Sequence, residues 1–400
     1  MRPRSCLPRG GSLSLDLRHR TVLLVLAGSR AHGTHTEGSD VDLKGAAIPP
    51  MAAVYGFMER FEQCDEAERF SVFYDLLTEP ERAAADAHGL EGVVYDVRKL
   101  LALATQANPN ILDVLFCRDQ EIRRCTPLGE LLRQHRELFV TQKARSTFSG
   151  YAAAQLKRIR NHRAWLLNPP AAAPTRADFD LPETPLVPRH QLEAAEAAIR
   201  KQIDTWELDL EALGEPERIM LREQVAHTLG DIGASMGLGA EDVPWSAAAR
   251  KIGLDDDLIE ALKRERAYRS ARRGYRSYQS WKANRNPQRA ALEAEHGYDS
   301  KHGAHLVRLL RMGKEILLTG RVHVWRGPEP GGPSDADELK AIRSGAWSYD
   351  QLIEWADAEN ASMDRILVEG RAVVPAGPDR AAIDRLCVQL VSEGLRRLDP

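Results

Sequence analysis

The spacing of apolar and polar residues separates a strand-containing start from a long helical remainder. Residues 21–27, TVLLVLA, form an unbroken apolar run that ends at Gly28, and this pattern predicts a buried strand followed by a turn. Val41 and Leu43 alternate with polar residues and lead into the apolar residues 46–48, just before two prolines. We therefore expect a second strand here, paired with the first around the loop between them.

The segment of residues 91–104, EGVVYDVRKLLALA, changes from a strand-like to a helical spacing. Asp96 stands at the change, where its side chain is suited to cap the first turn of the helix. Asn108-Pro109 predicts the start of another helix, because proline is favoured at the first helical position. Residues 1–125 are therefore expected to form a small domain of mixed strands and helices.

Helical spacing dominates after residue 125. A Pro-rich stretch, residues 168–190, interrupts it and predicts an extended loop, and residues 191–235 predict a helical hairpin. The pattern favours an α+β fold in three segments: a mixed-sheet domain over 1–125, a helical region with the linker and the hairpin over 126–245, and a helical C-terminal domain over 246–400. Ser348 followed by Gln351 predicts a capping box at the start of one C-terminal helix.

Bulk composition narrows the class of protein. A chain of 400 residues exceeds the ~250 to 300 residues at which a single core stops growing, so more than one core is expected. No apolar run approaches the ~20 residues that span a bilayer, and no signal sequence is recognisable at the start. The five cysteines are scattered without disulfide or metal-ligand spacing, which suits a reducing compartment. We therefore expect a cytoplasmic protein without a membrane partner.

The formal net charge of −3 excludes a polycation, so any affinity for nucleic acid must be local. Residues 263–289 concentrate lysine and arginine around aromatic residues. Arginine pairs with phosphates and aromatic rings stack on bases, so this composition suits single-stranded RNA. The candidate RNA-binding residues are Arg272, Arg273, Arg276, Tyr278 and Trp281. The alternative is an ordinary helix whose aromatic rings pack inward and whose arginines are solvated.

Residues 28–45, GSRAHGTHTEGSDVDLKG, carry the clearest candidate chemistry. Side chains alternate along a strand, so Asp40 and Asp42 share one face while Val41 points into the core. Two carboxylates held so close repel each other unless a cation lies between them, and oxygen ligands of this kind suit Mg²⁺. Gly28-Ser29 ends the preceding strand, where backbone N–H groups and a hydroxyl are able to meet phosphate oxygens. The alternative is a hairpin with a polar tip and two solvated aspartates.

This arrangement resembles the motif of the polymerase-beta-type nucleotidyltransferase superfamily, in which Gly-Gly or Gly-Ser is followed, after a gap, by Asp, an apolar residue and Asp or Glu. The resemblance implies a third carboxylate on a neighbouring strand, for which Glu91 and Asp96 are the candidates. Asp96 is explained by helix capping, so we favour Glu91. A solvated glutamate at a strand end is the alternative explanation of Glu91.

Several longer phrases are similar to one branch of that superfamily, the large predicted nucleotidyltransferases found near RNA ligases in bacterial and phage RNA-repair neighbourhoods. The phrases are GSRAHG with SDVDLKG, YDVRKLLALATQANPNILDVLF, FSGYAAAQLKRI, YDSKHGAHLVRLLRMGKEIL and TGRVHV, followed later by IRSGAWSYDQLIEWAD. They cover most of the chain, but they leave out the Pro-rich linker and the hairpin. Glu91 stands where this branch is expected to have aspartate.

The resemblance implies a mechanism. Asp40, Asp42 and Glu91 would hold two Mg²⁺ ions, with Mn²⁺ as the alternative ion, beside a nucleoside triphosphate, and pyrophosphate would be released. Ser29 would contact the outer phosphates. The family match further favours Lys301, His305 and Arg308, which share the polar side of the helix predicted over residues 298–317 and would line the nucleotide cleft; a solvated helix face is the alternative. Arg30 and Lys44 flank the motif and would neutralise the triphosphate, unless they are surface charges.

Three functions compete on this basis. The leading one is Mg²⁺-dependent transfer of a nucleoside monophosphate from an NTP to an RNA end, in RNA repair or processing. The second keeps the chemistry but uses a hydroxyl of a small molecule or a protein as acceptor. The third is a non-catalytic nucleotide- or RNA-binding module, against which the intact Asp40 and Asp42 argue, since a degenerate site usually loses its metal ligands.

Overall fold

The computed structural model describes residues 15–185, 253–285 and 287–399, together with residues 188, 190, 193–198, 246 and 249–251. Most of the hairpin predicted over residues 191–235 lies outside the described residues. The chain forms two compact units, Met1–Arg158 with Ser300–Pro400, and Ile159–Asp299. The C-terminal helices thus share a unit with the N-terminal sheet, whereas the sequence pattern placed them in separate domains; the boundaries near residues 125 and 245 stay predictions.

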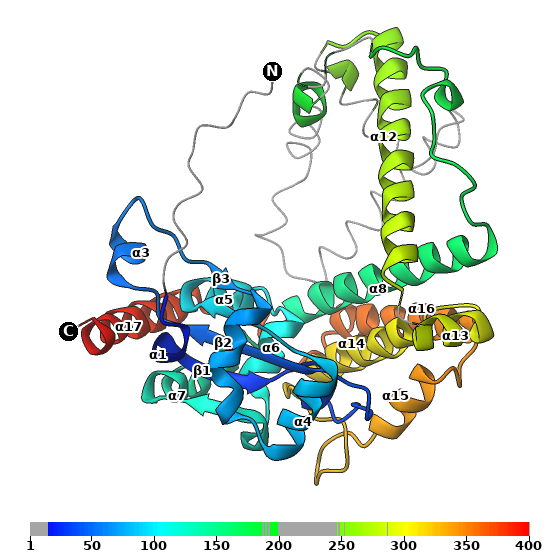
Figure 1. Cartoon of the computed structure of the whole chain (residues 1–400). Coiled ribbons are helices and arrows are strands. Elements are labelled where there is room, and N and C mark those ends of the chain that lie inside the picture. Colours follow the sequence, from blue (N-terminus) through cyan, green and yellow to red (C-terminus); the bar gives the residue numbers. More distant parts are fainter. Residues whose placement is uncertain are drawn as a thin grey trace. The chain divides into compact units, whose positions relative to one another are not determined.

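A mixed sheet of five strands organises the first unit (Figure 1). Its strands are β1 (Thr21–Leu26), β2 (Val41–Ala47), β3 (Gln63–Cys64), β4 (Leu90–Asp96) and β5 (Ile122–Cys125), in the order β3-β4-β2-β1-β5. β2 and β4 run parallel, and the other neighbouring pairs run antiparallel. The sheet and the helices that follow it confirm the predicted α+β class, and β1, β2 and β4 confirm the strands predicted from the apolar pattern.

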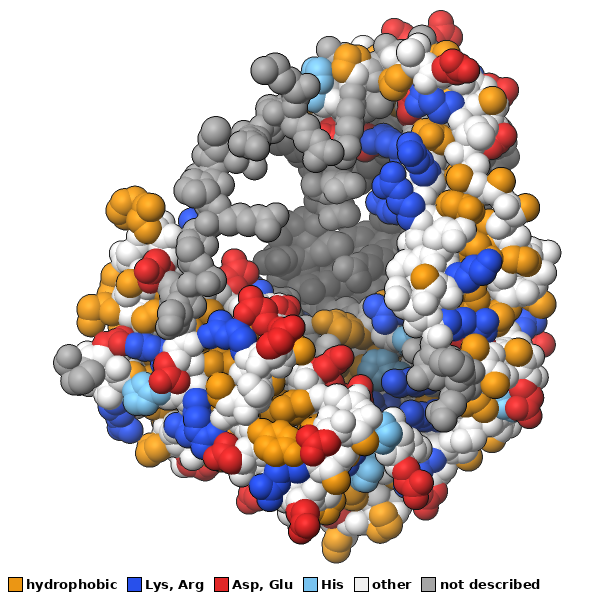
Figure 2. All heavy atoms as spheres, in the orientation of Figure 1, with side chains coloured by type: hydrophobic (Ala, Val, Ile, Leu, Met, Phe, Trp, Pro, Cys, Tyr) orange, Lys and Arg blue, Asp and Glu red, His pale blue; other side chains and the backbone are white. Residues whose placement is uncertain are grey.

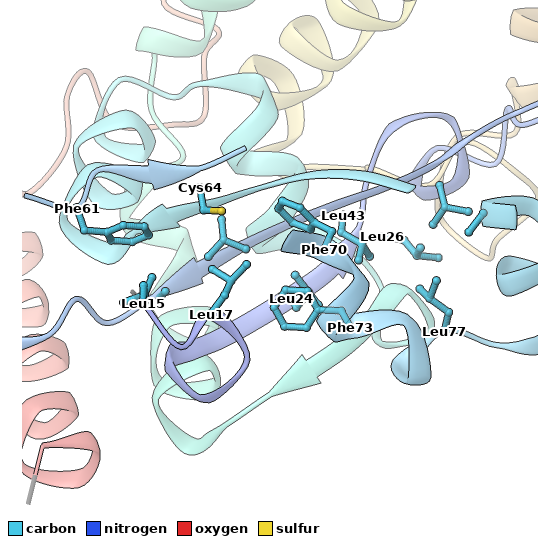
Figure 3. Close-up of a cluster of buried hydrophobic side chains, with 14 of the residues drawn as sticks. Leu15, Leu17, Leu24, Leu26, Leu43, Phe61, Cys64, Phe70, Phe73 and Leu77 are labelled. Atoms are coloured by element: carbon cyan, nitrogen blue, oxygen red, sulfur yellow. The ribbon is translucent and has the colours of Figure 1, made fainter. Parts of the chain in front are cut away.

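One face of the sheet packs on an apolar core (Figure 3). Leu24 and Leu43 point from β1 and β2 toward Phe70 and Phe73, and all four side chains are fully buried. The two phenylalanines belong to η1 (Ala67–Leu76), which covers this face together with α4 (Glu79–His88). Burying side chains of this size contributes roughly 1.5–3 kcal/mol each. The alternation that buries Leu43 turns Asp42 and Lys44 to the opposite face.

Helices cover that opposite face. α5 (Val97–Thr105), α6 (Pro109–Phe116) and α7 (Pro127–Gln134) contact the central strands, and α17 (Arg380–Leu398) packs on α5 and α7. The Asp96 carboxylate accepts a hydrogen bond from the backbone N–H of Arg98, and the Asn108 side chain accepts one from the N–H of Asn110. Both predicted helix starts are therefore confirmed.

The remaining helices of the first unit are α1 (Leu17–Arg20), α2 (Gly28–Ala31), α3 (Met51–Tyr55), the first part of α8 (Lys143–Leu167), α14 (Ser300–Thr319), α15 (Ala336–Arg343) and α16 (Tyr349–Val368), with the short 3₁₀ segments η2 (Asp119–Glu121) and η3 (Arg136–Phe139). Four leucines predicted to form the apolar face of α14 are buried: Leu306, Leu309, Leu310 and Leu317. Ser348 and Gln351 form the predicted capping box of α16.

The second unit contains the end of α8, η4 (Ala177–Phe179), α12 (Asp256–Ala283) and α13 (Pro287–His296). Trp165 of α8 lies against Tyr278 and Trp281 of α12, with ring centroids 5.8 and 5.5 Å away. These aromatic contacts stabilise the packing of α8 on α12. Among the described residues between 168 and 189, η4 is the only helix or strand. The Pro-rich composition predicted such an extended loop.

Candidate active site

Two carboxylates lie side by side on parallel neighbouring strands. Asp42 on β2 is the register partner of Glu91 on β4, so both side chains leave the sheet on the same face. Asp40 precedes β2 by one residue and shares the face of Asp42. Burial, and next the negative charge of Asp40 with a smaller contribution from Glu91, raises the pKa of Asp42 above its ordinary value. The three acids predicted to form the site are thus brought together.

The glycine turn touches this carboxylate cluster. Gly28 opens α2 with a φ of +60°, and a Cβ built on it would lie 2.1 Å from Oδ2 of Asp42. Only glycine combines this backbone conformation with such a close approach. The N–H of Ala27 also donates to the backbone oxygen of Asp42, at 2.8 Å. The glycine turn and the acids are therefore in direct contact, with the backbone of Gly28 against the carboxylate of Asp42.

Arg30 holds the start of β2 in place. Its Nε donates to the backbone oxygen of Asp40 and its Nη2 to that of Ser39, both at 3.0 Å. The residue therefore fixes the position of the Asp40 backbone from within the loop. Ser29 is half-buried, and no described residue is hydrogen-bonded to its hydroxyl group.

Two lysines accompany the acids. The Nζ of Lys44 donates to Oδ1 of Asn110 on α6 at 2.8 Å. Burial lowers the pKa of Lys44 below its ordinary value, although Asp113 and Asp42 act in the opposite direction. Lys301, at the start of α14, lies close enough to Asp42 for its positive charge to lower the pKa of that carboxyl group. Lys44 and Lys301 thus bring positive charge to the carboxylate cluster.

A pocket of about 340 Å³ opens beside the carboxylates. Its walls come from β2, β4, the segment before η1 and the first residue of η1. Its lining residues are Asp42, Leu43, Lys44, Asp65, Ala67, Glu91, Gly92 and Val93. Glu91 is exposed, so the carboxylate on β4 is open to solvent. The cluster is therefore accessible to a ligand from this side.

Beneath the carboxylates lies a buried group of charged and polar side chains that sequence reasoning did not anticipate in full. Asp113 of α6 is 5% exposed; its Oδ2 lies 3.3 Å from Nε2 of His32 and 3.6 Å from Nη1 of Arg308. Burial alone would raise the pKa of Asp113, but His32, Arg308 and Lys44 hold it well below its usual range. Burial, aided by Arg308, lowers the pKa of His305 to about 2, so its imidazole is neutral at physiological pH.

The segment of residues 319–326, which begins with TGRVHV, contacts the turn that carries His32. Nδ1 of His32 lies 3.1 Å from the backbone oxygen of Val324, and the N–H of Arg326 donates to the backbone oxygen of His32 at 3.1 Å. Arg326 is 1% exposed and is bound by Glu315 and Asp335. These contacts connect the turn that carries His32 with α14 and with the residue that precedes α15.

The predicted site residues differ in where they lie relative to the carboxylate cluster. Glu91 stands opposite Asp42, whereas Asp96 lies five positions further along β4, about 16 Å away at ~3.3 Å per residue, and binds Arg98. Arg308 and His305 lie beneath the carboxylates in the buried group, so a direct nucleotide contact by either stays a prediction. Asn110, Asp113 and His32 were not predicted; the helix start at Asn108-Pro109 predicted α6 but not the direction of its polar face.

The candidate RNA-binding residues lie on α12, where Figure 2 shows blue Lys and Arg side chains. Arg272, Arg273 and Arg276 are exposed. Tyr278 is only 6% exposed and packs on Trp165, as the alternative interpretation of this helix expected. Trp281 is half-buried, with the guanidinium of Arg285 4.5 Å from the centre of its ring. The arginines are thus available to a ligand, whereas Tyr278 is not.

The donor set fits divalent cations. Three carboxylates that converge on one face offer the hard oxygen ligands that Mg²⁺ prefers. Burial first, and the negative charge of Asp40 next, raise the pKa of Asp42, and a bound cation would relieve the repulsion between these two carboxylates. Among the described helices, none is both long and apolar enough to cross a bilayer.

Residues 14–166 match the model of the RlaP family, described as the RNA repair pathway DNA polymerase beta family. The matched segment contains the glycine turn and all three carboxylates. The match confirms the resemblance to polymerase-beta-type nucleotidyltransferases of RNA-repair neighbourhoods. No curated protein and no solved structure matches the chain.

Proposed function

We propose that this chain, whose residues 14–166 match a polymerase-beta-type family of RNA repair, transfers a nucleoside monophosphate from an NTP to an RNA end and releases pyrophosphate. The observation that carries the proposal is the convergence of Asp42 and Glu91 on neighbouring strands, with Asp40 on the same face and the backbone of Gly28 against Asp42. This arrangement joins a metal-binding carboxylate cluster to a turn suited to phosphate oxygens.

Asp40, Asp42 and Glu91 would hold two Mg²⁺ ions, or Mn²⁺ in their place. When bound, such ions polarise the α-phosphate and stabilise the charge that develops on the attacking and leaving oxygens. The protein's own contribution is to hold the three carboxylates on rigid strands. Arg30 supports this geometry, because it fixes the backbone at Asp40.

Ser29 and the N–H groups of the first turn of α2 are the candidate ligands of the β- and γ-phosphates. Lys44 and Lys301 are the candidate cations for the triphosphate, since both lie close to Asp42. We assign to His305 and Arg308 a supporting role beneath the site, through their contacts with each other and with Asp113. Their direct contact with the nucleotide stays a prediction.

RNA is the favoured acceptor for two reasons. The family that matches the chain is described as an RNA repair family. Arg272, Arg273 and Arg276 expose three cations on α12, beside the half-buried ring of Trp281. A hydroxyl group of a small molecule or of a protein is the competing acceptor, and binding of nucleotide or RNA without catalysis is the competing function.

The test is a transfer assay with the purified chain. Each α-³²P-labelled NTP is incubated with Mg²⁺ and with separate pools of RNA, protein and small hydroxylated acceptors, and Asp42→Ala serves as the control. The proposal predicts label in the RNA pool with the wild-type chain only. Label in another pool would show that the acceptor is a protein or a small molecule instead of RNA. Label in no pool, or equal label with Asp42→Ala, would refute nucleotidyl transfer by this site.

A further inference from the structure

We propose that Asp113 is a positioning residue of the nucleotide site, which acts through Lys44 rather than by touching the substrate. The inference rests on the proposed function, because it assigns Asp113 a task in binding the NTP. It concerns a carboxylate that lies outside the Gly-Ser and Asp-x-Asp motif and beneath the carboxylate cluster.

Asp113 joins three segments of the chain that are far apart in sequence. It lies on α6, while His32 comes from the loop after α2 and Arg308 comes from α14. Its Oδ2 is 3.3 Å from His32 Nε2 and 3.6 Å from Arg308 Nη1. Arg308 in turn donates to the neutral ring of His305, with Nη2 3.2 Å from Nδ1. One buried carboxylate thus organises the layer on which the active-site face rests.

α6 also contacts Lys44, through the side chain of Asn110. Asn110 and Asp113 are three residues apart and therefore share one face of α6. Asn110 accepts a hydrogen bond from Nζ of Lys44 at 2.8 Å, and the negative charges of Asp113 and Asp42 both raise the pKa of Lys44, against the effect of its burial. Lys44 is consequently held toward α6, between a buried carboxylate on one side and the carboxylate cluster on the other.

The contacts of Asp113 are not those of a group kept for stability alone. Its Oδ1 is buried and has no hydrogen-bond partner among the described residues, although a carboxylate oxygen in the interior normally has one. A buried ion pair contributes little to stability compared with an apolar side chain of similar volume. A buried negative charge between Lys44 and Arg308 does, however, fix where those two cations lie.

Removal of this charge has a specific consequence. In Asp113→Asn the shape of the side chain is kept, but Asp42 becomes the strongest negative partner of Lys44. The lysine then turns toward the metal-binding carboxylates, where it competes with divalent cations and is drawn away from the triphosphate. Supporting residues of this kind typically change metal affinity or activity by about 10- to 100-fold.

The test measures binding of a non-hydrolysable, fluorescent NTP analogue in the presence of Mg²⁺, so it does not depend on turnover. Asp113→Asn is expected to raise the Kd at least about tenfold. In the Lys44→Met background the same substitution is expected to change the Kd less than about twofold, because a residue that acts through Lys44 has no separate effect once Lys44 is absent. Glu81→Gln is the matched control: it neutralises another buried carboxylate, paired with Arg123, and should leave the Kd unchanged.

Each result decides the question. Equal losses with and without Lys44 would show a general structural role and overturn the inference, as would an unchanged Kd in Asp113→Asn. If Asp113→Asn does not fold, Asn110→Ala tests the same route, since it removes the hydrogen bond to Lys44 without touching the buried charge. An unchanged Kd in that variant would also overturn the inference. Failure of the wild-type chain to bind the analogue would instead refute the proposed function on which the inference rests.

Discussion

The backbone of Gly28 lies against the carboxylate of Asp42, so closely that a methyl group on Gly28 would come within 2.1 Å of Oδ2. Gly28 is the first residue of α2, which follows β1, and Asp42 lies on β2, which pairs antiparallel with β1. The contact makes the glycine turn and the acidic cluster interdependent. A triphosphate held by the turn would therefore lie directly beside the metal-binding carboxylates.

Substitution Gly28→Ala tests this contact. The new methyl group cannot be accommodated without moving Asp42, and the φ of +60° is unfavourable for alanine. We expect nucleotidyl transfer to fall at least ~100-fold, in line with the effect of a small displacement of reacting groups. Gly38→Ala in the same loop is the control, because a methyl group there meets no atom within 4 Å. Equal activity of the two variants would contradict the assignment.

Neutralising Asp42 is predicted to stabilise the fold while it abolishes activity. The folded-state pKa of Asp42 is raised, chiefly by burial and next by Asp40, so its ionised form destabilises the folded state at neutral pH. In EDTA at pH 7.5, Asp42→Asn should raise the unfolding midpoint by about 2–4 °C. The gain should shrink as the pH falls through the folded-state pKa, because wild-type Asp42 then becomes neutral as well. A lower midpoint for the variant at pH 7.5 would contradict the prediction.

The exposed arginines of α12 provide a test of RNA as acceptor. Replacing Arg272, Arg273 and Arg276 by Gln should weaken binding of single-stranded RNA and reduce the slope of log K against log salt by about 2, at ~0.7 per phosphate contact. The control replaces Arg371, Arg385 and Arg396, which are exposed in the other unit, and so makes the same change in net charge. If both triple variants keep the wild-type slope, this face of α12 does not bind RNA.

Arg326 is predicted to be essential for the stability of the first unit. Its guanidinium is bound by Glu315 and Asp335, with four contacts of 2.7 to 2.8 Å. Arg326→Met would leave these carboxylates without that partner and should lower the free energy of unfolding by about 3–5 kcal/mol, as measured by denaturant titration. Arg321→Met, at an exposed position of the same segment, should cost under ~0.5 kcal/mol. Similar losses in both variants would contradict the importance of the buried contacts.

The elements with strong local signals were predictable from the sequence. The apolar run of residues 21–27 predicted β1, and the Asp-x-Asp alternation predicted which face of β2 carries the acids. Asp96 and Asn108-Pro109 predicted two helix starts through capping. These features depend on residues near in sequence, which is why periodicity and capping reveal them.

Features that depend on long-range packing were not predictable in the same way. β5 has the sequence IRRC, without an apolar alternation, and becomes a strand because β1 offers it an edge. The group around Asp113 requires α6, α14 and the loop after α2 to meet, and no local pattern encodes that meeting. For the same reason, the sequence of α14 did not distinguish Lys301 from Arg308. Both were predicted to line the nucleotide cleft, but the side chain of Lys301 is exposed and that of Arg308 is buried.

Counting bound metal tests the central claim most directly. Electron paramagnetic resonance of Mn²⁺, titrated into the chain with a saturating non-hydrolysable NTP, reports the number of ions bound in excess of those on free nucleotide. Two ions per wild-type chain, and a loss of tight binding in Asp40→Asn, Asp42→Asn and Glu91→Gln but not in Asp65→Asn at the rim of the pocket, is the predicted result. Mn²⁺ binding that is unchanged when Asp42 and Glu91 are both neutralised would contradict it.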